Sequence, residues 1–295
     1  MIPTFNCASY LGRTLESVLS QDAGSDQMQI EVVDDCSTKD DPESVVRKIG
    51  SGRVHFYKSS KNQGISRNFN LCIARSRGHL VHILHGDDYV LPTFYTRVAE
   101  LALANPTVAF YCTRSFVVDE FGAIEGISPR VKSMEIPTRA AEEMYYTNPI
   151  RTPSVVVRRS FYEQNGGFLE GLSHVADWEM WVRSISRGTG IALNEPLCSY
   201  RAFASNDTGR LARSADNLRE FLRLGKAWRD TALTDFDLPR FTRMVTACCE
   251  AQMELFSARG DTEAYRANLK LWRELAPTSR KFRLFAREVS RYFKH

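Results

Sequence analysis

The chain has 295 residues, of which 43% are hydrophobic and 25% are charged, with a formal net charge of +4. This is the composition of a soluble globular protein, and no apolar run reaches the roughly 20 residues that span a bilayer, which excludes an integral membrane protein. The first residues have neither a basic leader nor an apolar stretch, so we expect no signal peptide. Seven scattered cysteines without C-x-x-C spacing predict a reducing, cytoplasmic location rather than disulfides or a zinc site.

Strand and helix patterns alternate over the first part of the chain. Strands are expected at 2–5, 29–34, 54–57, 80–84 and 108–112, with helices at 11–19, 43–49, 65–75 and 92–104. Such alternation indicates crossover units and an α/β fold with a mostly parallel sheet flanked by helices. The first strand has only about four residues, so either it is short or the chain begins inside it.

The pattern loosens from about residue 115. A strand is expected at 154–158 and an amphipathic helix at 177–186. Beyond Thr208 the strand signals disappear, and four helices are predicted at 211–229, 238–259, 262–275 and 280–294. We therefore expect an α/β domain over 1–208, with a charge balance of −3, and a helical C-terminal region over 209–295, with a balance of +7.

Polar residues follow three of the predicted strands. Asn6 follows the first strand, Asp34-Asp35 the second, and His85-Gly-Asp-Asp88 the fourth. Parallel α/β sheets bind ligands beyond the carboxyl ends of their strands. Adjacent carboxylates repel each other unless a cation or donors compensate, and Mg²⁺ and Mn²⁺ prefer oxygen ligands. Asp87 and Asp88 therefore predict a divalent cation site, and the alternative is a solvated turn with a helix cap at Asp88.

Six motifs, in order, resemble family 2 of the inverting nucleotide-sugar glycosyltransferases, which have the GT-A fold. The motifs are Pro3-Thr-Phe-Asn6, Val33-Asp-Asp-Cys-Ser-Thr38, Asn62-Gln-Gly-Ile-Ser-Arg-Asn-Phe-Asn70, His85-Gly-Asp-Asp88, Gly166-Gly-Phe168 and Asp177-Trp-Glu-Met-Trp181. The resemblance covers about residues 1–208 and implies a GT-A-type, Rossmann-like catalytic domain. The chain departs from the family pattern at Cys36 (usually Gly), Phe69 (more often Arg), His85 (Asp), Ala176 (Glu) and Phe203 (His).

The resemblance implies a nucleotide-binding set. Thr4 and Phe5 would flank a uracil or thymine ring, and Asp35 would accept a hydrogen bond from the N3–H of the base. Arg67 would reach the nucleotide. Asp87 would contact the ribose or donor sugar as well as the cation.

The resemblance also implies the catalytic groups. Asp87 and Asp88 would hold Mn²⁺ or Mg²⁺, which stabilises the diphosphate leaving group. Asp177 would be the general base that takes the proton of the attacking sugar hydroxyl, and its alternative interpretation is a helix N-cap. Weaker implied contacts to the acceptor or the diphosphate are His85, Gly167, Trp181 and Arg201.

The implied reaction is inverting, metal-dependent transfer by a hexosyltransferase-type enzyme, from a UDP- or dTDP-sugar to a hydroxyl of a free or lipid-linked saccharide, in surface polysaccharide synthesis. One alternative is a catalytically silent nucleotide-sugar-binding or scaffold protein, which the departures at His85, Ala176 and Phe203 favour. Another is a sugar nucleotidyltransferase. That class needs a Gly-rich basic phosphate loop after the first strand, and Asn6-Cys-Ala-Ser-Tyr10 does not supply one.

Residues 280–295 contain six basic residues and one acid, and their apolar residues fall near helical spacing. We expect a basic amphipathic helix there. It has three interpretations, which are packing on its own domain, peripheral contact with the anionic inner face of a membrane, and a dimer contact. Nucleic-acid binding is not expected, because no recognised motif accompanies the charge.

Overall fold

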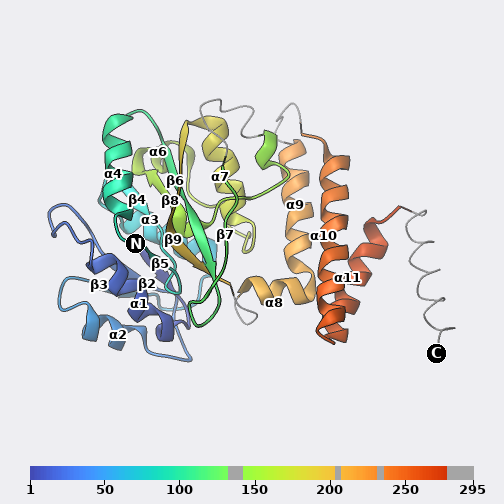
Figure 1. The fold of residues 1–295 in the computed structure, drawn as a ribbon, viewed down its shortest axis with the longest axis horizontal. Coiled ribbons are helices and arrows are strands. Elements are labelled where there is room, and N and C mark those ends of the chain that lie inside the picture. Colours follow the sequence, from blue (N-terminus) through green and yellow to red (C-terminus); the bar gives the residue numbers. More distant parts are fainter. Residues whose placement is uncertain (132–141, 203–206, 231–235, 278–295) are drawn as a thin grey trace. The chain divides into compact units, whose positions relative to one another are not determined.

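The computed structural model of the chain describes residues 1–131, 142–202, 207–230 and 236–277. The chain divides into two compact units, Met1–Phe203 and Ala204–His295, and each is described by itself (Figure 1). The predicted helix over 280–294 and residue Phe203 lie outside the described residues.

The first unit begins with a three-stranded parallel sheet. Its strands, in the order β1-β2-β3, are β1 (Ile2–Thr4), β2 (Glu31–Asp34) and β3 (His55–Lys58). The crossover helices are α1 (Ala8–Leu19) and α2 (Pro42–Ile49). Helix α1 forms because Leu11, Leu15 and Val18 fall on one face, which is buried. Thr4, Asp34 and Lys58 pair in register, so the carboxyl ends of the strands share one edge.

Backbone hydrogen bonds join this sheet to the next strand. Helix α3 (Ile65–Arg75) leads to β4 (Leu80–His82), beyond which Leu84 N donates to Met1 O at 3.1 Å and Gly86 N to Pro3 O at 3.0 Å. Strands β2 and β3 therefore lie on one side of β1, and the chain after β4 lies on the other. Such a reversal of strand order marks the ligand-binding edge of α/β sheets.

The second sheet is mixed. Its strands are β5 (Tyr89–Val90), β6 (Phe110–Val118), β7 (Ile124–Ile127), β8 (Val155–Arg158) and β9 (Gly190–Arg201), which follow β4 in the order β4-β8-β6-β9-β5, with β7 beside β6. Among the described strands of this sheet, only β6 and β9 pair in parallel. The α/β fold is confirmed, but parallel pairing dominates only the first sheet. Antiparallel neighbours need no crossover helix, and the regular strand–helix alternation ends after α4.

Helices cover the sheets of the first unit (Figure 1). They include α4 (Phe94–Ala104), α6 (Arg159–Asn165) and α7 (Ala176–Arg187), and a 3₁₀ turn, η1 (Thr152–Ser154), precedes β8. Phe94, Phe110 and Trp181 are fully buried side chains of this core. Burying each of them contributes about 3 kcal/mol, which holds the strand ends in place.

The second unit is helical. Its helices are α8 (Asp207–Ser214), α9 (Asp216–Asp230), α10 (Leu238–Ala258) and α11 (Thr262–Leu275). The single helix predicted over 211–229 is in fact two, because Ala215 has a left-handed φ of 61° that interrupts it. Helix α10 packs against α9 and α11. Within the described ranges, no helix is both long and apolar enough to cross a membrane.

Candidate active site

An acidic loop, residues 85–88, follows β4 at the carboxyl edge of the sheet. Asp88 is 1% exposed, and its Oδ1 accepts a hydrogen bond from Arg201 N at 2.7 Å. Its Oδ2 lies 3.3 Å from Nδ1 of His85. Ligand atoms of His85, Asp87 and Asp88 all lie within 4.8 Å of one another. The loop therefore gathers two carboxylates and an imidazole around one point.

The backbone of this loop is held from two sides. Thr14 of α1 directs its hydroxyl to the carbonyl oxygens of Gly86, at 3.0 Å, and Asp88, at 2.7 Å. Arg201 donates through Nε to Asp87 O at 2.9 Å and through Nη1 to two carbonyls of the β6–β7 turn. Because Arg201 is 5% exposed and bonded to backbone, it fixes the position of the acidic loop.

Several charged groups of the acidic loop shift one another's pKa. Burial and the neighbouring Asp88 raise the pKa of Asp87 to about 7. Burial by itself would lower the pKa of His85, but its contact with Asp88 and the charges of Asp87 and Asp177 outweigh it and raise that pKa. The negative charge of Asp87 and Asp88 in this buried loop would stabilise a bound cation.

A divalent cation fits these residues. Among the described residues, the buried Nε2 of His85 has no hydrogen-bond partner, which costs about 1–3 kcal/mol, and Oδ2 of Asp88 has only the contact with His85 Nδ1 at 3.3 Å. A cation would satisfy such atoms and offset the repulsion between Asp87 and Asp88. Carboxylates suit Mg²⁺ and Mn²⁺, whereas an imidazole suits transition metals.

Asp177 lies in the first turn of α7. The N-cap residue of α7 is Val175, and no side chain makes a capping hydrogen bond there. The interpretation of Asp177 as the N-cap is therefore wrong. Its Oδ1 accepts from Trp178 N at 2.6 Å, and Oδ2 lies 3.3 Å from Thr152 Oγ1. Burial raises the pKa of Asp177, and nearby positive charges, including that of His85, oppose the rise. Asp177 therefore shares an electrostatic environment with the acidic loop.

The loop after β2 is built around Asp35, which is 3% exposed. Its two oxygens accept from Gln63 N at 2.8 Å and Gly64 N at 2.9 Å, which positions the start of α3. Burial raises the pKa of Asp35 in spite of these bonds. Cys36 has a left-handed φ of 63°, a conformation that glycine adopts at no steric cost. This conformation explains why the family motif usually has a glycine at the position that Cys36 occupies in this chain.

The two residues at the end of β1 differ in exposure. Thr4 is 2% exposed, and its Oγ1 would lie 2.7 Å from a Cβ at Gly86, so it packs beneath the acidic loop. Phe5 is 44% exposed and presents an accessible aromatic ring. Of this pair, only Phe5 is placed to stack on a ligand.

Helix α3 carries two further residues of the motif. Arg67 forms an exposed ion pair with Glu170, with 2.8 Å between Nε and Oε2. Phe69 is 3% exposed and stacks on the His85 ring, with centroids 5.2 Å apart and planes 16° apart. The sequence interpretation treated Phe69 only as a missing arginine, and its contact with the acidic loop was not foreseen.

The turn before α7 leaves no room for a side chain at Gly167. A Cβ there would lie 2.1 Å from Oδ1 of Asn70. That oxygen accepts from Phe168 N at 2.7 Å, while Asn70 Nδ2 donates to Phe168 O at 2.9 Å. Arg183 donates to Gly167 O at 2.6 Å. Asn70 and Arg183 thus fix the loop that leads to Asp177.

Trp181 is a core residue. It is 1% exposed, and its ring lies 5.4 Å from Phe110 and 6.1 Å from Phe168. The structure therefore gathers Asp87, Asp88, His85 and Arg201 at the acidic loop and places Trp181 in the interior.

Sequence reasoning also missed Thr14 and Asn70. Thr14 is a buried hydroxyl among the leucines of α1, and that apolar face was the available signal. Asn70 closes the third motif but carries no distinguishing pattern of its own.

Comparison with known proteins identifies relatives of the chain. The chain is 24% identical to an uncharacterised glycosyltransferase of Haemophilus influenzae over 75% of each chain. It is 20% identical to a chondroitin synthase of Pasteurella multocida, over 95% of this chain but only 27% of the synthase.

Solved structures share the fold. TarS 1–349 of S. aureus in complex with UDP-GlcNAc has a TM-score of 0.58 and 16% identity, over 92% of this chain and 90% of that one. A mannosyltransferase of Pyrobaculum calidifontis in complex with GDP-Man and Mn²⁺ has a TM-score of 0.56 and 17% identity, over 92% and 81% of the two chains. The family model for glycosyl transferase family 2 matches residues 1–166. Because that match spans more than half of the chain, the protein belongs to glycosyl transferase family 2 and is a glycosyltransferase.

Proposed function

We propose that the protein transfers a sugar from a UDP- or dTDP-sugar to a hydroxyl of a saccharide, with inversion and with a divalent cation. The observation that carries the proposal is that His85 lies beside Asp87 and Asp88 at the carboxyl edge of the sheet, and that its charge also acts on Asp177. Strand order reverses at this edge, where α/β sheets bind their ligands.

Donor binding would use the ends of β1 and β2. Phe5 would stack on the base, because its ring is accessible. Asp35 would accept from the base N3–H with a lone pair that its two backbone bonds leave over. Arg67 would reach the nucleotide by leaving Glu170, an exposed pair worth under about 1 kcal/mol. Two structural neighbours were solved with nucleotide sugars, UDP-GlcNAc and GDP-Man, which supports a donor of this class.

The carboxylates would divide the chemistry between them. Asp87 and Asp88 would hold Mn²⁺ or Mg²⁺, and the bound cation would supply Lewis-acid stabilisation of the diphosphate leaving group. Asp177 would take the proton from the attacking hydroxyl, and the pKa raised by burial strengthens it as a base. Attack on the face opposite the diphosphate would invert the anomeric centre.

A panel of UDP-, dTDP- and GDP-sugars with Mn²⁺, read as donor hydrolysis or transfer, tests this function. We expect turnover of a UDP- or dTDP-sugar that chelation abolishes. Asp87→Asn should weaken Mn²⁺-dependent UDP binding by at least about tenfold, because one of the two carboxylates loses its charge. UDP binding without turnover of any donor would instead favour a silent binding protein, and Mn²⁺-dependent UDP binding unchanged by Asp87→Asn would contradict the cation site.

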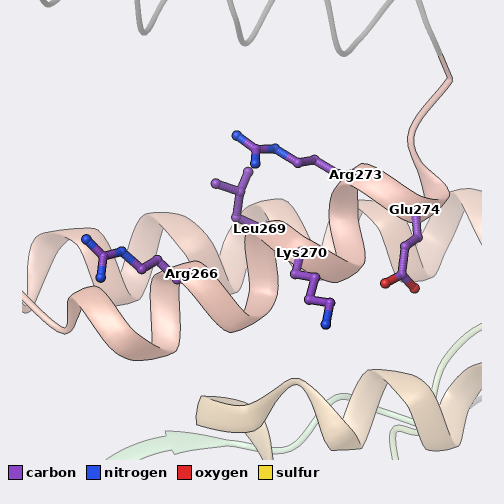
Figure 2. Close-up of a pocket in the computed structure, with 5 residues that line it drawn as sticks. All are labelled: Arg266, Leu269, Lys270, Arg273 and Glu274. Atoms are coloured by element: carbon purple, nitrogen blue, oxygen red, sulfur yellow. The ribbon is translucent and has the colours of Figure 1, made fainter.

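We further propose that residues 1–208 are the catalytic domain and that the C-terminal region, 209–295, contacts an anionic membrane surface bearing the acceptor. The basic residues of 280–295, whose structure lies outside the described residues, suggest this contact. Residues Arg266, Leu269, Lys270, Arg273 and Glu274 of α11 line a pocket (Figure 2). Within the described part of the chain, its three cations form no ion pair, whereas Glu274 pairs with Arg219 at 3.7 Å.

Vesicle co-sedimentation of the full chain tests this contact. Each cation near an anionic bilayer contributes about 1 kcal/mol, so changing Arg266, Lys270 and Arg273 together to Ala should lower partitioning about 100-fold. A matched control changes three exposed cations of the first unit, Arg47, Lys48 and Lys61. Equal loss in both variants, or equal binding to neutral vesicles, would contradict the proposal.

A further inference from the structure

His85 is the one residue of the acidic loop that is neither an aspartate nor a glycine. Its ring nitrogens have hydrogen-bonding or ligand capacity that the described part of the molecule does not take up. Nδ1 lies 3.3 Å from Asp88 Oδ2, but the geometry leaves Oδ2 without a hydrogen bond. The buried Nε2 likewise has no hydrogen-bond partner among the residues that the structure describes. A buried polar atom without a partner destabilises the folded chain, so the position of Nε2 calls for a partner that the described residues do not supply.

The imidazole is held in one orientation. Phe69 stacks on it at 5.2 Å and 16°, and Phe168 packs edge-on against Phe69, with centroids 5.0 Å apart. Phe69 and Phe168 are each 3% exposed, so neither ring can turn freely. On the other side, the bond from Arg201 N to Oδ1 holds Asp88. Both halves of the His85–Asp88 pair are thus fixed before any ligand arrives.

We propose that His85 supplies a nitrogen ligand to the divalent cation held beside Asp87 and Asp88, and that Phe69 is the positioning residue that fixes its ring. The proposal rests on the proposed function, which introduces the cation. Its consequence is cation preference. A site of carboxylates and phosphates alone accepts Mg²⁺ readily, whereas an imidazole ligand favours Mn²⁺ over Mg²⁺.

Pulsed electron paramagnetic resonance of Mn²⁺ bound to the full chain with UDP tests the assignment directly. A coordinated imidazole gives ¹⁴N modulation of the Mn²⁺ spin echo, whether or not the enzyme turns over. We expect this modulation in the unaltered protein and its loss in His85→Gln. His79→Gln is the matched control, because His79 is an exposed histidine six residues earlier, and it should keep the signal.

Two further variants test the preference and the positioning role. His85→Asp should lower the ratio of Mn²⁺ to Mg²⁺ affinity, measured calorimetrically with UDP, by about tenfold or more. Phe69→Leu keeps an apolar side chain but loses the stacked ring, so it should weaken Mn²⁺ binding about tenfold and broaden the nitrogen signal. Thermal unfolding checks that each variant is folded.

The outcomes separate the two proposals. Mn²⁺ that binds with UDP but shows no nitrogen modulation overturns the role of His85 and leaves the proposed function standing. Modulation that survives in His85→Gln also overturns it, because another histidine would be the ligand. Phe69→Leu with unchanged affinity and signal overturns the positioning role. Failure of Mn²⁺ to bind even with UDP contradicts the cation in the proposed function, and the His85 assignment falls with it.

Discussion

Asp88 uses its two carboxylate oxygens differently. Oδ1 accepts the backbone N–H of Arg201, whereas Oδ2 faces His85 and accepts no hydrogen bond from the described part of the chain. One side chain therefore anchors β9 to the acidic loop and still presents charge to a ligand. Asp35 differs, because both of its oxygens accept backbone N–H groups, at Gln63 and Gly64. Charge at this edge is fixed by backbone contacts.

Gly167→Ala is expected to destabilise the first unit by about 1–3 kcal/mol. The new Cβ would lie 2.1 Å from Asn70 Oδ1, and moving Asn70 away would break both of its bonds to Phe168. Thermal unfolding measures the change. Gly126→Ala is the control, because a Cβ there meets nothing within 4 Å, and it should change stability by under about 0.5 kcal/mol. Equal effects of the two substitutions would show that the Asn70 contact is not needed.

The sequence singles out a side chain as a candidate where its residue type carries the chemistry. Asp87 and Asp88 stand out in the sequence as adjacent acids after a strand. Phe69 and Asn70 do not stand out, because their roles depend on tertiary contacts with His85 and Phe168, which are distant in the sequence. No local pattern encodes such a meeting.

At the scale of elements, strands and helices with a clean period were predicted well. Helix α3 has the predicted bounds, Ile65–Arg75, and α7 differs from its predicted range by one residue at each end. Most of strand β9 was missed because polar residues and Pro196 interrupt its pattern, and its pairing with β6 is irregular at Arg114 and Pro196. The β6–β7 hairpin was missed because β7 is largely exposed and lacks an apolar face.

Close packing of α9 on α10 depends on Gly225. A Cβ there would lie 2.6 Å from Cδ1 of Phe241, which is fully buried and cannot retreat. Alanine in a helix normally gains about 1 kcal/mol over glycine, but here overpacking should make Gly225→Ala destabilising by about 1–2 kcal/mol. Thermal unfolding measures this. Phe241→Leu makes room, so Gly225→Ala should cost less in that background, and simple additivity of the two changes would refute the contact.

At the scale of the whole molecule, the mild net charge of +4 separates into two parts. The −3 part includes the acids at the carboxyl edge of the sheet, and the +7 part includes the cations of α11 and of residues 280–295. The family match lies entirely within the first part. Membership of the family therefore supports the transfer chemistry of the first part. The proposal for the second unit concerns how the chain reaches its acceptor.

The transfer rate of Asp177→Asn, measured beside its affinity for UDP, tests the central claim most directly. The amide cannot take the proton of the attacking hydroxyl, so transfer should fall about 10²–10⁴-fold while UDP affinity stays the same. Glu100→Gln, at an exposed acid of α4, should alter neither quantity. Transfer that survives in Asp177→Asn at the rate of the unaltered protein would contradict the account.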